Sequence, residues 1–367
     1  MTRKKTLALV AAATGLLAVL ATQNSALADT NEGSDSTLVM VGSDTSQDVM
    51  EGLSQVVVNG AGNPLLSNYK ATPVGRTVTT RTANAANCTF TVARSSGEGV
   101  NALAASIAGT AFNGGGATTP VTSPNMTGCV DVARSSSATI SPSPNPGAGN
   151  LTLIPFATDS VSFATTNVSG IQHRLTLAAL KAYYTSNGTP GSAGSAGCRG
   201  AKPLLPASGS GTRNFFRTML GITSDTIGAT GGWGTCVRDT NAAGTPIQEH
   251  DGRFLTDSQQ LVPFSVSQYI AQQSSQISDI RGRATLGSID WTDTALAAKA
   301  TSPVLLQTSF GQGTRQLYNV VQTSRLGDAK VSEAFVGGGS DVCQATATIQ
   351  AYGLATYAQC GSTTLTN

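Results

Sequence analysis

A loop of small hydroxyl and glycine residues at 208–213 is the stretch of this sequence best suited to bind a ligand. It reads Ser-Gly-Ser-Gly-Thr-Arg and precedes an apolar helical pattern. Glycine lets the backbone approach a ligand closely, and the first N–H groups of a helix have no intrahelical partner, so such a junction can hold an anion. Ser210, Thr212 and Arg213 add side-chain donors. An ordinary Ser or Thr cap after a glycine turn is the alternative interpretation.

Comparable junctions recur at 43–46, 94–97 and 134–137, each with Ser or Thr hydroxyls at the end of an expected strand. In an open α/β sheet the carboxyl ends of the strands face one crevice, so these loops are expected to converge. A helix terminus contributes about 0.3 to 2 kcal/mol to anion binding, and a charge-assisted hydrogen bond about 1.5 to 3 kcal/mol. Several junctions together could therefore form a micromolar site, whereas one alone could not.

The rest of the chain must position these junctions. Its first residues are basic, and an apolar run and then Ala-Leu-Ala follow before Asp29. This pattern predicts a cleavable signal peptide over residues 1–28 and a secreted or extracytoplasmic protein. No cysteine stands at the expected cleavage site to carry a lipid. Cleavage reduces the 22 basic residues to 19, against 20 acidic ones. The remaining balance gives no support for a nucleic-acid partner.

The length after residue 28 favours two domains over one core. Apolar strands near 151–156 and 261–264 look like two crossings between lobes. We therefore expect a discontinuous first lobe joined to the second by a strand hinge. Nearer the end, a strand at 304–306 and a helix over 315–322 are expected. The expected first lobe covers 36–160 and 262–367, and the second covers 161–261.

Six cysteines in an exported chain favour disulfides over metal ligation. Sequence order suggests three bridges, but this is one of fifteen connectivities. The pairs in that order are Cys88 with Cys129, Cys198 with Cys236, and Cys343 with Cys360.

The order of these motifs resembles the periplasmic-type phosphate-binding proteins of ABC importers, in a secreted bacterial variant. The resemblance covers most of the chain after the signal peptide. It implies an α/β, two-lobed type II periplasmic-binding-protein-like fold that closes on a dehydrated oxyanion. It also implies inorganic phosphate or a related oxyanion as ligand, an ABC importer permease as partner, and a monomer. The motifs are Val-Gly-Ser-Asp-Thr-Ser at 41–46, Arg-Ser-Ser-Gly at 94–97, Asp-Val-Ala-Arg-Ser-Ser at 131–136 and Ser-Gly-Ser-Gly-Thr-Arg-Asn-Phe-Phe at 208–216.

Carried over by position, the resemblance implies donors from three loops, the third of them in the second lobe. With their neighbours, the expected ligand-binding residues are Asp44, Thr45, Ser46, Ser95, Ser96, Arg134, Ser136, Ser210, Gly211, Thr212 and Arg213.

Two departures from the family's pattern bear on which anion binds. The family's arginine falls on Pro206, and its proton-accepting aspartate falls on Ser136. Arg213 and Arg134 are candidates to replace the cation, and Asp44 to replace the acceptor. A carboxylate that accepts a hydrogen bond from protonated phosphate repels sulfate, so its loss would weaken that discrimination. For both arginines, a surface or interlobe salt bridge is the alternative.

Two other functions stay open, although we expect a binding protein with no catalytic residue, metal or cofactor. In the first, a secreted phosphatase-like hydrolase would use Ser210 with His250 and Asp251. Against it, Ser208 occupies the first glycine position of a nucleophile elbow, and both His250 and His173 are better explained as satisfied or solvated histidines. In the second, a secreted scaffold keeps the fold and has lost its ligand.

Overall fold

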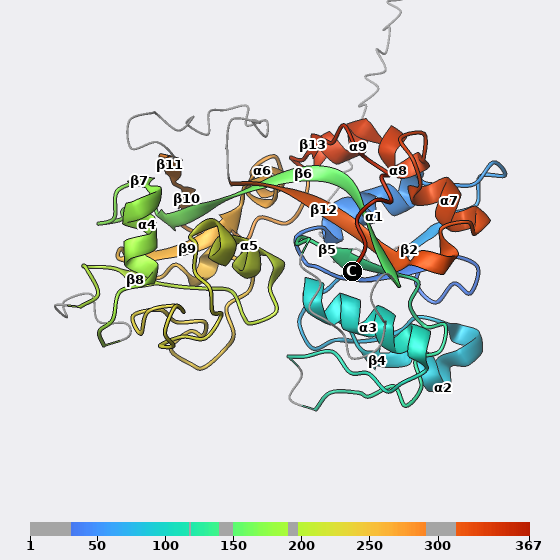
Figure 1. Cartoon of the computed structure of the whole chain (residues 1–367), viewed down its shortest axis with the longest axis horizontal. Coiled ribbons are helices and arrows are strands. Elements are labelled where there is room, and N and C mark those ends of the chain that lie inside the picture. Colours follow the sequence, from blue (N-terminus) through green and yellow to red (C-terminus); the bar gives the residue numbers. More distant parts are fainter. Residues whose placement is uncertain (1–30, 117–118, 139–149, 190–196, 291–312) are drawn as a thin grey trace, which may run out of the picture.

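Figure 1 shows two lobes, with strand β6 (Leu151–Thr166) running from one into the other. Within the described ranges a nine-stranded sheet passes through both lobes in the order β2-β1-β5-β12-β6-β9-β8, with β10 and β13 also paired to β6. The protein therefore has the mixed α/β, two-lobed fold expected from its sequence. The computed structural model describes residues 31–116, 119–138, 150–189, 197–290 and 313–367.

The first lobe is built on three parallel strands, β2, β1 and β5, with β12 antiparallel beside β5. Its chain is discontinuous, because the last elements of the protein return to it. Its helices and strands are β1 Leu38–Gly42, α1 Gln47–Val56, β2 Leu66–Asn68, β3 Thr77–Thr79, η1 Thr82–Asn84, α2 Ala85–Cys88, β4 Thr89–Thr91, α3 Ser96–Ala108, β5 Val132–Ser135, β12 Thr314–Gln322, η4 Thr323–Arg325, α7 Ala329–Phe335, α8 Asp341–Gln344, α9 Thr346–Ala351 and β13 Ala355–Thr356.

Strand β1 explains why helices cover both faces of this sheet. Its residues alternate between two buried clusters, since successive side chains of a strand point to opposite faces. Leu38 and Met40 pack with α1, whereas Val39 and Val41 pack with α3. The strand is therefore buried on both sides and reads as a continuous apolar run, as parallel strands do.

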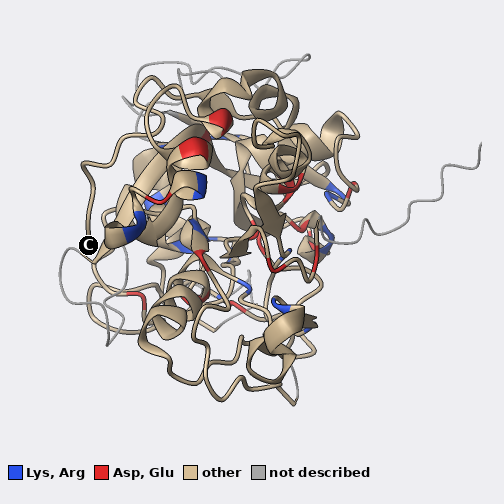
Figure 2. Cartoon of the chain, turned by 90° about the vertical axis from the view of Figure 1, so that its right-hand side faces the viewer, with Lys and Arg blue, Asp and Glu red and all other residues tan. Residues whose placement is uncertain are grey.

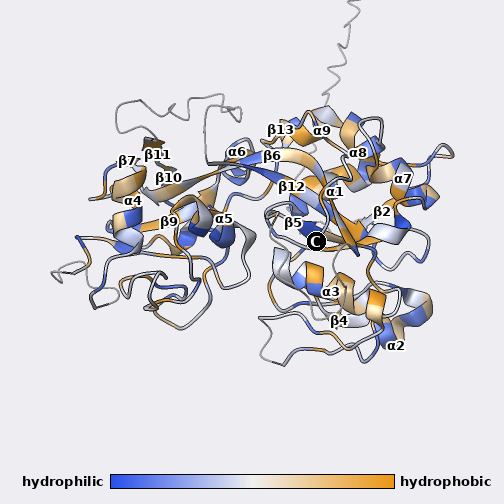
Figure 3. Ribbon diagram, viewed as in Figure 1, coloured by the Kyte–Doolittle hydropathy of each residue, from blue (hydrophilic) through white to orange (hydrophobic). Residues whose placement is uncertain are grey.

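The second lobe has two buried clusters of its own, and Figure 3 shows hydrophobic segments in both lobes. Trp233, Tyr184 and Phe216 pack edge-on or stacked at the centre of the larger cluster. Its helices and strands are β7 Arg174–Thr176, α4 Leu177–Tyr184, β8 Lys202–Pro203, α5 Gly211–Met219, η2 Gly252–Phe254, β9 Gln260–Ser265, β10 Ala284–Leu286 and β11 Ser288–Asp290, with α6 Val266–Gln273 at the junction with the first lobe.

The pairing of β6 marks where one lobe passes into the other. Residues 151–160 of this strand pair with β12, and residues 161–165 pair with β9. The strand β9, expected to be a second crossing, therefore lies within the second lobe. The buried clusters extend that lobe to Ile289, beyond the boundary expected at 262, because β10 and β11 also pair there.

The helix expected over 315–322 is wrong, since this segment forms strand β12. Pairing with β5 on one side and β6 on the other satisfies its backbone and overrides the local helical pattern. The strand expected at 304–306 and the signal peptide expected at 1–28 lie outside the described residues.

Three disulfides join the cysteines in the order suggested by the sequence: Cys88–Cys129, Cys198–Cys236 and Cys343–Cys360. Figure 2 shows acidic and basic residues both spread along the chain, most of which carries no charge. Among the described helices, none has the length and apolar character needed to cross a membrane.

Candidate functional site

Three helix N-termini meet between the lobes. Helices α1 and α3 begin in the first lobe, and α5 begins in the second. Ser95 caps α3 by accepting a hydrogen bond from the Glu98 amide at 3.3 Å, and Ser210 caps α5 by accepting one from the Arg213 amide at 2.9 Å. Because the dipoles of all three helices are positive at these ends, the place where they meet favours negative charge.

A buried group of hydroxyls, which we call the hydroxyl cluster, connects these termini. It consists of Thr45, Ser96, Ser136 and Thr212. The oxygen of Ser136 lies 3.2 Å from that of Ser96 and 3.4 Å from that of Thr45. Thr45 in turn lies 3.4 Å from Thr212, which belongs to the other lobe. The loops expected to converge from distant parts of the sequence therefore do so.

Arg315 brings a buried positive charge to the cluster. It lies on β12, 3% exposed, and its Nη2 donates to the Thr212 hydroxyl at 2.9 Å. Asp159, directly opposite on β6, accepts hydrogen bonds from Arg315 Nε at 3.1 Å and Nη2 at 2.9 Å. This ion pair holds the Arg315 guanidinium in place. The positive charge of the site therefore comes from β12 and β6, the strands that connect the two lobes.

The carboxylate of Glu249 occupies the centre of the site. Its Oε2 accepts hydrogen bonds from the hydroxyls of Thr212 at 2.6 Å and Thr45 at 2.9 Å, and lies 3.1 Å from His250 Nε2. Thr45 and Thr212 belong to different lobes, so this one oxygen bridges them. Glu249 is 8% exposed.

The tautomer of His250 follows from its surroundings. Its Nδ1 accepts a hydrogen bond from the Ser265 amide at 3.3 Å, so the neutral ring carries its proton on Nε2. This nitrogen faces Thr45 and Glu249, and acts there as a donor. Ligand atoms of Asp44, Glu249 and His250 lie within 4.8 Å of one another, a spacing that suits a metal ion. A protonated Nε2 cannot ligate one, so His250 in this tautomer is not a metal ligand.

Two buried carboxyl groups of the site have opposite pKa shifts. Burial raises the pKa of Asp44 well above its ordinary value, and the negative charge of Glu249 adds to this effect. For Glu249, burial works to raise the pKa, but the hydrogen bond from His250 and the charge of Arg315 outweigh it and lower the pKa. Glu249 is therefore the ionised member of the pair, and Asp44 is the protonated one.

Apart from the two arginines, the sequence-predicted site residues lie in the hydroxyl cluster or directly beside it. Thr45, Ser96, Ser136 and Thr212 form the hydroxyl cluster, while Ser95 and Ser210 cap helices beside it. The remaining residues at these junctions are Ser46, which precedes α1, Gly211, which begins α5, and Asp44, which lies beside Glu249.

Both arginines expected as the cation have other partners. Arg134 donates to the backbone carbonyls of Ser43, Met40 and Gly42 and to the Asn68 side chain, and so fixes the end of β1. Arg213 pairs with two carboxylates of its own lobe, Asp225 at 2.8 Å and Asp239 at 3.0 Å, and donates to the Pro206 carbonyl.

Sequence reasoning missed Glu249 and Arg315, and it interpreted His250 as satisfied or solvated. For Arg315 a signal existed, because Gly-Thr-Arg occurs both at 211–213 and at 313–315. For Glu249 and His250 we find none, because the surrounding segment lacks a long helix or strand whose periodicity would orient the side chains.

The arrangement does not form the triad considered from the sequence. Asp251 accepts its hydrogen bonds from Arg253, and both ring nitrogens of His250 have other neighbours, Ser265 and the pair Thr45 and Glu249. No chain of hydrogen bonds from Ser210 through His250 to Asp251 is therefore formed.

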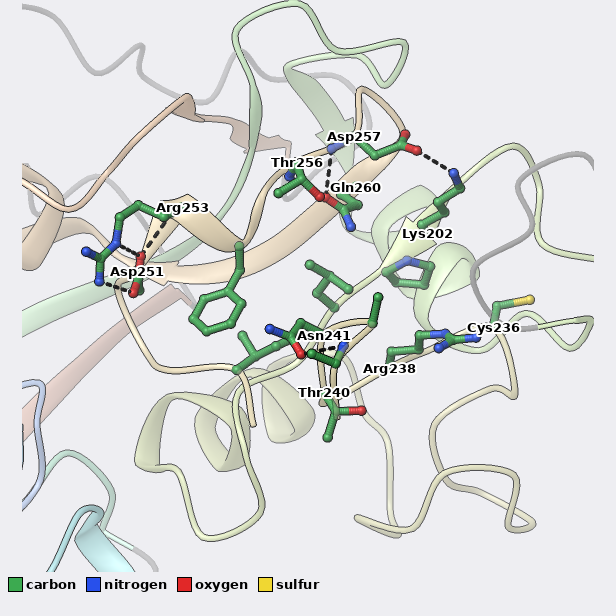
Figure 4. Close-up of a pocket in the computed structure, with 16 residues that line it drawn as sticks. Lys202, Cys236, Arg238, Thr240, Asn241, Asp251, Arg253, Thr256, Asp257 and Gln260 are labelled. Carbon is green, nitrogen blue, oxygen red and sulfur yellow. Dashed lines mark hydrogen bonds and ion pairs between the residues drawn. The ribbon is translucent and has the colours of Figure 1, made fainter. Parts of the chain in front are cut away.

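A separate cavity of about 770 Å³ lies within the second lobe. Figure 4 shows two ion pairs on its lining, Lys202 with Asp257 and Arg253 with Asp251. Leu204, Ile247 and Phe254 give the lining an apolar part. Arg238 also lines this cavity, which is separate from the hydroxyl cluster.

No known protein family and no curated protein matches the sequence. Among solved structures, similar ones include an ABC-type phosphate transport receptor from Vibrio cholerae, 13% identical, with 87% of this chain and 100% of that chain covered and a TM-score of 0.48. Another is a putative phosphate ABC transporter substrate-binding protein with bound phosphate from Clostridium perfringens, 13% identical, with 88% and 99% covered and a TM-score of 0.49. A human phosphate-binding apolipoprotein is 13% identical, with 87% and 90% covered and a TM-score of 0.44. The similarity concerns the arrangement of the chain, and the ligands named are those of the other proteins.

Proposed function

We propose that this protein is an extracytoplasmic solute-binding protein that holds an oxyanion, inorganic phosphate in the first place, between its lobes for uptake. The observation that carries the proposal is the convergence of three helix N-termini and a buried arginine on one hydroxyl cluster. Uptake would require an ABC importer permease as partner. The role proposed is binding, without catalysis.

The proposed ligand donors come from both lobes and from the sheet between them. Thr45, Ser96 and Ser136 act from the first lobe, Thr212 from the second, and Arg315 from β12. The amides that follow Ser46, Ser95 and Ser210 add donors at the three helix starts. Arg134 and Arg213 act behind the site by holding its loops in place.

Buried polar atoms support a site made for a further partner. Eight buried side-chain atoms of the described residues have no hydrogen-bond partner, and two of them, Asp44 Oδ1 and Ser46 Oγ, lie at this site. Unpaired buried polar groups are rare in proteins, and a bound ion is one of the partners that can satisfy them.

The disulfides support the proposal that the protein is exported. Three bridges imply an oxidising compartment, outside the cytoplasm. We propose that the signal peptide expected over residues 1–28 directs the chain there.

A scaffold without a ligand is the second candidate function. It is favoured by one observation, that Glu249 already accepts hydrogen bonds from hydroxyls of both lobes. In this alternative the site serves only to join the lobes.

Isothermal titration of the protein with phosphate, and then with sulfate, tests the proposal. We expect phosphate to bind, and the Thr212→Val variant to bind about tenfold more weakly, because it keeps its shape and loses one hydrogen bond. The matched control is Thr218→Val on the exposed side of the same helix, where affinity should not change.

The two candidate functions predict opposite outcomes of this titration. A lack of heat with phosphate, sulfate or arsenate at millimolar concentration contradicts the binding function and leaves the scaffold. Equal effects of Thr212→Val and Thr218→Val would instead remove the hydroxyl cluster from the binding site.

A further inference from the structure

We propose that Glu249 is an internal ligand: its carboxylate takes the place of the oxyanion and holds the two lobes together while no solute is bound. The inference rests on the proposed function only for the identity of the anion that replaces Glu249. Its own basis is the set of contacts made by one carboxylate oxygen.

The donors that Glu249 uses are those proposed for the solute. Its Oε2 accepts from Thr45 at 2.9 Å and from Thr212 at 2.6 Å. A hydroxyl has one proton, so neither residue can donate to Glu249 and to a bound anion at the same time. Arg315 Nη2, 2.9 Å from the Thr212 hydroxyl, adds its positive charge beside the carboxylate. Glu249 and a solute oxyanion therefore compete for the same groups.

Repulsion adds to this competition. An oxyanion at the hydroxyl cluster would lie next to the Glu249 carboxylate in a buried site, where like charges repel strongly. Binding therefore requires Glu249 to turn out of the site or to take up a proton.

Glu249 is held firmly where it acts. The next residue, His250, has a backbone φ of 59°, its carbonyl accepts from Gln272 at 2.9 Å, and its ring accepts from the Ser265 amide. Gln268 also donates from α6 to the Thr45 carbonyl at 2.6 Å. The turn that carries Glu249 is thus fixed against α6, and the carboxylate reaches across to the first lobe.

The contact with Thr45 gives Glu249 a second effect besides competition. Thr45 precedes helix α1 of the first lobe, and Glu249 is fixed in the second. Removing the carboxylate removes a direct bond between the lobes. We infer that the protein without Glu249 opens when no solute is present and closes again on an anion.

The test compares wild type, Glu249→Ala and, as matched control, Glu333→Ala on the exposed surface of α7. Isothermal titration with inorganic phosphate measures affinity, and small-angle X-ray scattering measures the radius of gyration with and without phosphate. We expect Glu249→Ala to bind phosphate about tenfold or more tightly than wild type. We also expect it to be more extended alone and to contract when phosphate is added. Glu333→Ala should match wild type in both measurements.

The outcomes separate this inference from the proposed function. Phosphate bound by Glu249→Ala and not by wild type supports the internal ligand and contradicts solute binding by the native protein. Weaker or unchanged binding in Glu249→Ala, when wild type does bind, overturns the internal ligand and keeps the proposed function. If neither protein binds, expansion of Glu249→Ala supports the bridge between lobes, and an unchanged radius overturns it. Should Glu249→Ala fail to fold by circular dichroism, Glu249→Gln keeps the shape and removes the charge, with the same direction expected.

Discussion

Asp44 and Glu249 are buried side by side, and the charge of Glu249 shifts the ionisation of Asp44. Burial and the Glu249 charge raise the pKa of Asp44, whereas His250 and Arg315 keep Glu249 ionised against the effect of burial. The site therefore combines one neutral and one charged carboxyl group. This combination affects both the stability of the protein and the anion that it accepts.

We expect Asp44→Asn to stabilise the protein at pH 7 and to have little effect at pH 4. Below the ordinary pKa of 3.8, Asp44 is largely protonated in both the folded and the unfolded chain, and near pH 4 the folded state has only begun to lose stability relative to the unfolded chain. As the pH rises toward the raised folded pKa, the unfolded chain loses its proton first, and the folded state becomes relatively less stable. The uncharged amide avoids this loss, which grows by about 1.4 kcal/mol for each pH unit between the unfolded and the folded pKa.

Thermal unfolding of both proteins between pH 4 and pH 8 measures this effect. Asp35→Asn is the control, because Asp35 is exposed. A constant difference between Asp44→Asn and wild type across the range would show that Asp44 does not keep its proton.

At this scale the sequence predicted the parts of the site that follow from local rules. Thr45, Ser96 and Thr212 stand at helix starts, where the spacing of apolar residues locates them. Glu249 reaches the site from an irregular segment, and no local pattern determines where such a side chain points. Its position depends on tertiary contacts such as that between Gln272 and His250.

At the scale of elements, β12 shows why the cation was missed. Its residues 315–322 suit a helix locally, but two neighbouring strands supply backbone partners on both sides. The helix prediction gave Arg315 no defined place opposite Asp159. Only the pairing register of β12 with β6 brings the two charges together, and register between distant strands is set by the whole sheet. Helix α6, by contrast, has a local start signal, because Ser265 caps it directly before Val266.

The start of α5 lies so close to the first lobe that a side chain on Gly211 would displace two serine hydroxyls. A Cβ on Gly211 would lie 2.6 Å from the Ser96 hydroxyl and closer still to that of Ser136. We expect Gly211→Ala to force the lobes apart and to weaken phosphate binding about tenfold or more, since these hydroxyls cannot all keep their hydrogen bonds. Each lobe should stay folded, because the clash lies between them.

Gly97→Ala is the matched control on α3. There a Cβ meets only the Gly209 carbonyl at 3.7 Å, an ordinary contact. Titration with phosphate and small-angle scattering should therefore distinguish the two variants. Equal affinities for Gly211→Ala and Gly97→Ala would show that the lobes do not need this close approach.

At the scale of the whole molecule, the two lobes share one sheet but have separate hydrophobic cores. The nine-stranded sheet runs through both lobes in the described part of the chain, and β6 belongs to both. Each lobe nevertheless has its own buried clusters and at least one disulfide. The two-lobed plan could be predicted because strands, helices and a break in the chain are local signals. The boundary at residue 262 could not, because β9 resembles a crossing strand in sequence and its pairing with residues 161–165 of β6 keeps it in the second lobe.

The disulfide Cys198–Cys236 should contribute mainly to the second lobe, where long stretches lack helices and strands. Replacing both cysteines by serine relaxes a loop closed over 38 residues, and a loss of about 2 to 4 kcal/mol is expected for such a bridge. Limited proteolysis followed by mass spectrometry should then show faster cleavage within 197–259, with cleavage of the first lobe unchanged.

Replacing Cys343 and Cys360 by serine should have the opposite effect, with faster cleavage near the C-terminal helices and unchanged cleavage of the second lobe. If either pair of substitutions exposes both lobes equally, the lobes unfold as one unit, and the shared strand β6 couples them more strongly than their separate cores suggest.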